Sequence, residues 1–174
     1  MAIAKYLVLG ALLLGACSTL SILNSPTADY RSYVNPRVQE KKSFDRGREV
    51  MSLKVIPATR ALKDAQERAT PGHSFDYKNQ LRQVIVAAAL PNASDFSAQD
   101  LKMTLGGREL DWIHEIDSQV IDETQYYFAY PFHRVFLLDF SKPESQISTE
   151  ELEIRSPRGK VAFTLNFEED NEGH

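Results

Sequence analysis

The sequence contains very little cysteine, because Cys17 is the only one in 174 residues. A lone cysteine cannot form a disulfide within the chain, although exported proteins commonly use disulfides for stability. A zinc site built from several cysteines is excluded for the same reason. We therefore expect a domain that is stabilised by its own hydrophobic core.

The sequence also lacks an excess of positive charge and a long apolar run. It holds 20 Lys and Arg against 24 Asp and Glu, which gives a net charge of −4. Removal of residues 1–16, which hold one Lys and no acidic residue, changes the net charge to −5. Nucleic acids are bound by basic surfaces, so we expect no nucleic-acid partner. The apolar run at residues 6–16 is shorter than the about 20 residues that a membrane-spanning helix needs.

Motifs of common catalytic and nucleotide-binding sites are absent as well. The motif Gly-x-Ser-x-Gly, which carries the nucleophile of many hydrolases, does not occur. The segment Ser156-Pro157-Arg158-Gly159 is typical of a turn. The segment Gly106-Gly107-Arg108 is too short for a phosphate-binding loop. We expect no catalytic residue and no cofactor.

Histidines and acidic residues do not have the spacing of a metal site. The four histidines are His73, His114, His133 and His174, and no two of them are four residues apart. The set that comes nearest to a zinc site is His114 with Asp111, Glu115 and Asp117, three members of an acidic cluster. The whole cluster consists of Asp111, Glu115, Asp117, Asp122 and Glu123. It could supply oxygen ligands to Ca²⁺, but its spacing matches no known calcium-binding loop. We expect solvated charge there and no bound metal.

The N-terminal residues have the pattern of a secretory leader. Lys5 supplies a positive charge, and an uncharged apolar stretch follows it. The stretch ends in Leu14-Gly15-Ala16-Cys17, which resembles the lipobox of bacterial lipoproteins. The resemblance covers the leader alone, and beyond it the chain is similar only loosely to uncharacterised envelope lipoproteins with sandwich domains.

The lipobox resemblance implies a chemical role for each of these residues. The thiol of Cys17 would receive a diacylglyceryl group, and a signal peptidase would recognise Leu14, Gly15 and Ala16 and cleave before Cys17. Two or three acyl chains on Cys17 would hold the protein on a bilayer, whereas one chain binds only reversibly. Because Ser18 and not Asp follows the cysteine, the resemblance favours the outer membrane, facing the periplasm.

Residues 17–43 show no sustained period of 2 or 3.6 and contain two prolines, so we expect a lipidated cysteine followed by a tether. An alternative is that Tyr30, Tyr33 and Val34 dock on the domain as an early strand. The domain itself is expected at residues 44–168, and an acidic tail at 169–174.

Alternating apolar residues predict strands throughout residues 44–168. Met51, Leu53 and Val55 share one side of a strand that Pro57 ends, and Thr59 can cap a short helix that Pro71-Gly72 stops. Residues 81–90 are almost continuously apolar, which is typical of a strand buried on both faces. Further alternating sets begin with Leu101, Leu152 and Val161. Gly106-Gly107 suits a two-residue hairpin turn, and we expect the return strand at 108–116 with Leu110 and Trp112 pointing inward.

A crowded aromatic run is expected to form one or two strands. Tyr126, Phe128, Tyr130 and Phe132 have one parity, which Phe136, Leu138 and Phe140 continue. Pro131 would mark a bend between two strands. Tyr127 and His133 would then point to the other side. Tyr127 and Arg134 are the candidates for a partner surface, because interfaces are often anchored by Tyr, Trp and Arg.

These patterns predict a mainly β fold with one short helix. An antiparallel β-sandwich, immunoglobulin-like or transthyretin-like, is the first choice, and a small β-barrel is the alternative. The expected function is that of a membrane-anchored, non-catalytic lipoprotein that binds an envelope protein or cell-wall partner. One alternative is a carrier of a small apolar ligand. Another is a cell-wall hydrolase that uses His114 or His133.

Overall fold

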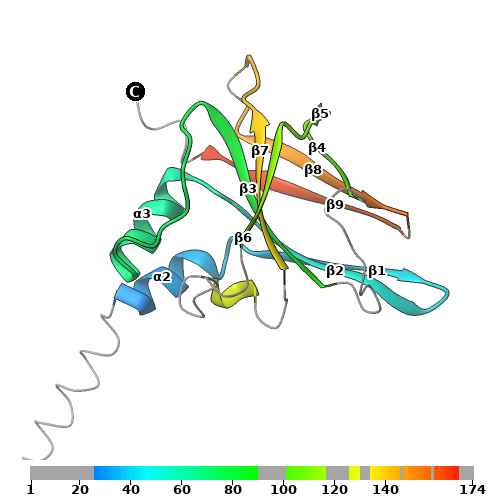
Figure 1. Cartoon of the computed structure of the whole chain (residues 1–174), viewed down its shortest axis with the longest axis horizontal. Helices are drawn as coiled ribbons and strands as arrows, with labels where there is room; N and C mark the ends of the chain where they lie inside the picture. Colours follow the sequence, from blue (N-terminus) through cyan, green and yellow to red (C-terminus); the bar gives the residue numbers. More distant parts are fainter. Residues whose placement is uncertain are drawn as a thin grey trace, which may run out of the picture.

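The computed structural model describes residues 26–89, 101–116, 126–129, 134–145, 147–157 and 159–168. Their strands form two antiparallel sheets that face each other (Figure 1). The fold is therefore mainly β, as predicted, and it is an antiparallel sandwich. The strands within these ranges do not close into the small barrel that was the alternative.

The larger sheet has five strands in the order β1-β2-β3-β7-β6. Its strands are β1 (Gln39–Asp45), β2 (Arg48–Pro57), β3 (Leu81–Ala89), β7 (Arg134–Ser141) and β6 (Trp112–Ile116). The smaller sheet has the order β5-β4-β8-β9. Its strands are β5 (Arg108–Glu109), β4 (Lys102–Leu105), β8 (Thr149–Ser156) and β9 (Gly159–Asn166).

Side chains of one parity from each sheet fill the space between the two sheets. Phe136 and Phe163 are both fully buried there, as their alternating patterns predicted. The predicted turns also form, because Gly106 and Gly107 have φ of 56° and 78° and Ser156 pairs with Gly159. The sandwich core is thus built from the strict two-residue periods of the sequence.

Two helices cover the outer face of the five-stranded sheet (Figure 1). They are α2 (Pro26–Val34) and α3 (Arg60–Ala69), and the short 3-10 helix η2 (Tyr127–Ala129) packs with them. This layer explains the apolar strand β3. Val84 and Val86 face the sandwich core, whereas Ile85 and Ala87 face the helices, so the strand is buried on both faces.

The expected tether is wrong from Pro26 onwards. Residues 26–34 form a helix whose Tyr30 and Val34 are buried against α3 and the sheet, and β1 follows at Gln39. The alternative of an early strand at Tyr30 to Val34 is also wrong, although the docking that it assumed does occur. The nine-residue helix buries too few side chains to give a clear 3.6-residue period. The sequence therefore predicted only the helix after Thr59, whereas the described residues contain two α-helices.

The return strand expected at residues 108–116 is broken into two pieces. β5 belongs to the smaller sheet and β6 to the larger one, and the amide of Asp111 donates to the carbonyl of Asp139 at 3.0 Å between them. Leu110 and Ile113 both pack against the sandwich core, so the inward phase shifts by one residue at this bend. Trp112, which was expected to point inward, is therefore 66 % exposed.

The aromatic run does not form one continuous strand. Tyr126 and Phe128 are buried, but they lie at η2 and pack in the helical layer on the outer face of the sheet. Phe136, Leu138 and Phe140 are the only members of the run's apolar parity that the described residues place in the sandwich core. Tyr130, Pro131 and Phe132 lie outside the described residues.

No helix within the described ranges is both long enough and apolar enough to cross a membrane.

Candidate functional site

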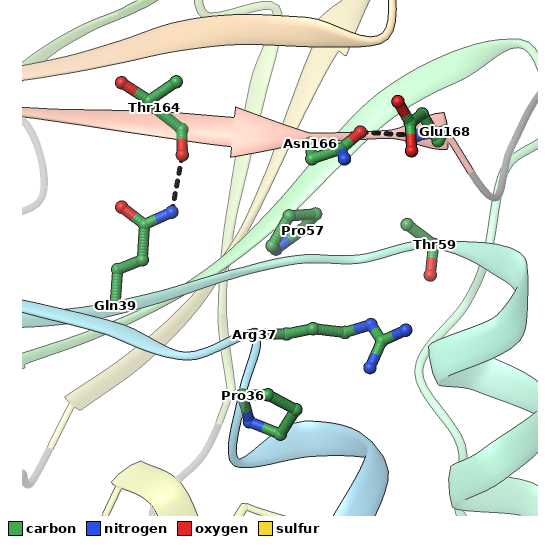
Figure 2. A pocket seen from close by; sticks show the side chains of 8 residues that line it. All are labelled: Pro36, Arg37, Gln39, Pro57, Thr59, Thr164, Asn166 and Glu168. Atoms are coloured by element: carbon green, nitrogen blue, oxygen red, sulfur yellow. Dashed lines mark hydrogen bonds between the residues drawn. The ribbon is translucent and has the colours of Figure 1, made fainter.

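An open pocket of about 400 Å³ lies where the helical layer meets the last strand of the smaller sheet (Figure 2). Three segments that are distant in sequence form it: the link between α2 and β1, the link between β2 and α3, and the end of β9. Its lining residues are Pro36, Arg37, Gln39, Pro57, Thr59, Thr164, Asn166 and Glu168. We call it the polar pocket.

Two buried residues between β2 and α3 contribute to the polar pocket. Pro57 ends β2, and Thr59 adopts extended backbone angles as the N-cap of α3. The Thr59 hydroxyl accepts a hydrogen bond from the amide of Leu62 at 3.2 Å, as the sequence predicted, and it shares another with the Tyr33 hydroxyl at 3.2 Å. Thr59 is thereby fixed from both helices.

Arg37 is held at the exposed rim of the polar pocket by Tyr33. Its Nη1 donates to the Tyr33 carbonyl at 2.9 Å, and its guanidinium carbon lies 4.0 Å from the centre of the Tyr33 ring. This cation–π contact restricts a side chain that would otherwise be flexible. The positive charge of Arg37 therefore has a defined place beside the pocket.

The opposite wall is the outer edge of β9, which side chains of β1 bridge. Gln39 donates from Nε2 to the carbonyl of Thr164, and Lys41 donates from Nζ to the carbonyl of Ala162. At the end of the wall, the Glu168 amide donates to Oδ1 of Asn166 at 2.9 Å (Figure 2). These bonds join the two sheets along this side and hold the polar groups of β9 in place.

The polar pocket combines one guanidinium, one carboxylate, two side-chain amides and two hydroxyls. Such groups bind a polar ligand by hydrogen bonds and charge. Of the two hydroxyls, that of Thr59 already bonds the Tyr33 hydroxyl and the Leu62 amide. Across the described residues, no three His, Cys, Asp or Glu side chains are grouped as metal ligands.

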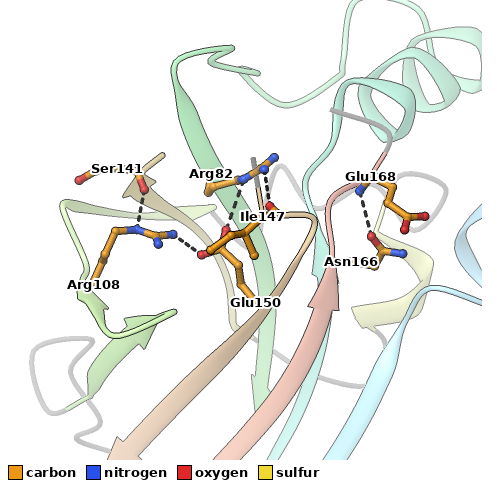
Figure 3. A network of polar contacts seen from close by, with 7 residues as sticks. All are labelled: Arg82, Arg108, Ser141, Ile147, Glu150, Asn166 and Glu168. Atoms are coloured by element: carbon orange, nitrogen blue, oxygen red, sulfur yellow. Dashed lines mark hydrogen bonds and ion pairs between the residues drawn. The ribbon is translucent and has the colours of Figure 1, made fainter. Parts of the chain in front are cut away.

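A second polar cluster lies between the two sheets (Figure 3). Glu150 of β8 pairs with Arg82 of β3 at 3.4 Å and with Arg108 of β5, and the side chains of Glu150 and Arg82 are only 2 % and 3 % exposed. Arg82 also donates to the carbonyl of Ile147 at 3.0 Å, and Arg108 to that of Ser141 at 2.9 Å. Because these groups cross-link three strands and the side chains of Glu150 and Arg82 have little access to solvent, we assign the cluster to stability.

The predicted partner residue Tyr127 lies against α2. Its hydroxyl donates to Oδ1 of Asn35 at 2.5 Å, its ring meets that of Tyr30 edge to face at 6.0 Å, and Arg31 lies 5.1 Å from its ring centre. Burial raises the pKa of Tyr127, although Arg31 opposes the shift. The side chain is half-buried and takes part in docking α2 on the domain.

Arg134, the other predicted partner residue, is tied to a neighbouring strand. Its Nε and Nη2 both donate to the Glu115 carboxylate at 2.6 Å, and the guanidinium lies 5.2 Å from the centre of the Phe136 ring. The paired carboxylate raises the pKa of Arg134. Tyr127 and Arg134 thus each make defined contacts within the chain.

The remaining predicted residues are either exposed or outside the described ranges. His114 is exposed on β6, and the zinc set built around it is not formed by the described members Asp111 and Glu115. The residues outside the described ranges are Leu14, Gly15, Ala16, Cys17, Asp117, Asp122, Glu123, His133 and His174.

Sequence reasoning missed the polar pocket and the exposed indole of Trp112. The pocket residues lie in three separate segments, and no spacing within one segment signals them. Searches among known protein families, curated proteins and solved structures find no match for this chain.

Proposed function

We propose that this chain is a lipid-anchored protein of the bacterial cell envelope whose β-sandwich domain binds another envelope component at the polar pocket. The domain performs no chemistry on that component. The observation that carries the binding role is the pocket itself, since it gathers a held guanidinium, a carboxylate and several hydrogen-bonding groups around about 400 Å³.

The lipobox at Leu14 to Cys17 supports the anchor, and the position of α2 sets its reach. Only eight residues separate Cys17 from Pro26, where α2 begins. A fully extended chain spans at most about 3.6 Å per residue, so the domain would lie within roughly 30 Å of the lipid. The proposed partner is therefore a component near the membrane surface, and we favour the outer membrane facing the periplasm.

The filled core argues against the carrier of a small apolar ligand. Phe136, Phe140, Phe163 and Phe167 are all fully buried among the side chains between the sheets. Besides the polar pocket, a smaller pocket of about 260 Å³ lies beside Tyr30 and Tyr33 in the helical layer. Neither pocket opens into the space between the sheets, where the carrier would need one.

Photo-cross-linking in the native envelope tests the binding role. A photo-reactive amino acid in place of Asn166, on the exposed rim, is expected to form one specific adduct, and Arg37→Ala is expected to reduce its yield. The control places the same photo-reactive group at the exposed Lys102 of β4, which β8 separates from the pocket strand β9. Absence of an adduct from position 166, or the same adduct from both positions, would contradict the proposal.

A further inference from the structure

The indole of Trp112 is the most exposed large apolar side chain of the described residues, at 66 %. It is also the only tryptophan of the chain. Burial of such a ring normally contributes strongly to stability, and exposed tryptophans are typical anchors of protein interfaces. The bend after β5 leaves this ring in solvent at the start of β6, although Leu110 and Ile113 on either side pack inward.

Three of the positive side chains near Trp112 are paired with carboxylates, whereas Lys142, directly after Ser141, has no ion pair among the described residues. On the strands and loop next to β6, Arg108 pairs with Glu150, Arg134 with Glu115, and Lys78 with Asp139 at 2.7 Å. The charges near the indole that lack an ion-pair partner are therefore Lys142 and acidic residues that no cation pairs.

Two such acidic residues precede Trp112 in the chain. Glu109 and Asp111 are both exposed, and within the described part of the chain neither of them forms an ion pair. Asp111 accepts one hydrogen bond, from the Ser141 hydroxyl at 2.8 Å. Both carboxylates lie within three residues of the indole in the chain. An indole attracts an ammonium or guanidinium group by cation–π interaction, and carboxylates attract it by charge.

The strand that carries Trp112 is an edge strand. In the described residues β6 pairs with β7 alone, whereas β1 and β9 are bridged to each other by Gln39 and Lys41 and β5 is only two residues long. An edge of five residues can accept an extended peptide as an additional strand. Side chains of that peptide would then face the outward residues of β6, Trp112 among them.

We propose that Glu109, Asp111, Trp112 and the outer edge of β6, together named the Trp112 surface, bind an extended segment of a partner protein that carries Lys or Arg. The segment adds a strand to β6 and places a cationic side chain on the indole. This inference goes beyond the polar pocket and needs neither that pocket nor the lipid anchor.

Emission of Trp112 in the detergent-solubilised full-length protein provides the test. A seven-residue peptide that alternates Val and Lys is expected to give a saturable change in emission, whereas the matched peptide of Val and Glu gives none. Replacement of both carboxylates, by Glu109→Gln with Asp111→Asn, is expected to weaken binding by about three- to tenfold, and added salt weakens it further. Asp45→Asn, at an exposed position of β1 on the opposite edge of the sheet from β6, is the control and leaves binding unchanged.

Two further measurements separate the parts of the proposal. Methylation of alternate backbone amides of the Lys peptide is expected to weaken binding, because it removes strand pairing. In Trp112→Ala, which stays folded by circular dichroism because the side chain is exposed, a labelled Lys peptide is expected to lose binding by anisotropy.

The proposal is overturned by equal responses to the two peptides, by no response at millimolar peptide, by equal binding of the methylated peptide, or by full binding to Trp112→Ala. These outcomes concern the Trp112 surface alone, and the cross-linking experiment concerns the pocket alone, so the failure of one proposal is distinguishable from the failure of the other.

Discussion

Single residues with buried charge or unusual backbone angles limit what the sandwich tolerates. Glu150 lies between two arginines from different strands, and its side chain is 2 % exposed. A buried charge that loses its partner keeps its desolvation cost without the compensating attraction. Gly106, at the turn between β4 and β5, lies beside the same carboxylate. The cluster and the turn therefore depend on each other.

We expect Glu150→Gln to destabilise the domain strongly. The change leaves Arg82 buried without a negative partner, and the loss of one partner from a buried pair costs about 3 to 5 kcal/mol. Urea unfolding followed by circular dichroism gives the free energy of unfolding. Glu151→Gln, the exposed neighbour in β8, is the control, and equal midpoints for the two variants would show that the cluster does not stabilise the fold.

Gly106→Ala is expected to be more harmful than Gly107→Ala. Both glycines have positive φ, and an alanine there costs about 1 to 2 kcal/mol from backbone strain. At Gly106 an added Cβ would also lie 2.7 Å from Oε2 of Glu150, whereas at Gly107 it would meet nothing within 4 Å. Thermal unfolding of both variants checks the order, and an equal loss in Tm would mean that the carboxylate moves away freely.

Among the elements, α2 decides where the tether ends and the folded domain begins. Tyr30 is 1 % exposed, and its hydroxyl accepts a hydrogen bond from the buried Gln66 of α3 at 3.1 Å. The pKa of Tyr30 is strongly raised by burial, although the bond from Gln66 opposes this. The helix thus belongs to the folded domain, and the linker from Cys17 is short.

Tyr30→Ala is expected to destabilise the whole domain by roughly 3 to 5 kcal/mol, because truncation of a buried aromatic leaves a cavity. Phe44→Ala, which removes an aromatic that is 60 % exposed on β1, is expected to change stability little. Both values come from denaturant midpoints. Equal and small losses of stability in the two variants would indicate that α2 is part of the tether and not of the folded domain.

How far the sequence predicts an element depends on how many residues it buries in a regular order. β9 buries Val161, Phe163 and Leu165 in strict alternation, so its position and its inward face were predictable. α2 buries only two of nine residues, and its one clear signal was Pro26 at the first helical position. Trp112 was misplaced because a bend shifts the phase, and a two-residue period cannot reveal such a bend.

As a whole molecule, the protein is a sandwich with a helical layer on one face. The predicted fold class is confirmed, because the apolar alternation of β4, β8 and β9 and the continuous apolar strand β3 together require a sheet pair with a further layer that covers β3. The polar pocket was not predictable, since its walls come from residues 36–39, 57–59 and 164–168. Only the packing of α2, α3 and β9 brings these segments together.

Stability of the whole domain is expected to fall in alkali. Burial raises the pKa of Tyr126 to about 12 and raises that of Tyr30 as well, above the ordinary value of about 10. The unfolded chain therefore loses these protons first, and stability is lost as the pH rises from about 10 to 12. Thermal melts across this range check the expectation. A Tm that stays constant while tyrosine absorbance at about 295 nm shows complete ionisation would contradict it.

The most direct test of the account is mass spectrometry of the mature N-terminus, isolated from the native envelope. The account predicts a chain that begins at Cys17 and carries a diacylglyceryl group, together with a Cys17→Ala variant that takes up no labelled fatty acid. A mature chain that retains residues 1–16, an unmodified Cys17, or normal labelling of Cys17→Ala would contradict the lipid anchor on which the proposed function depends.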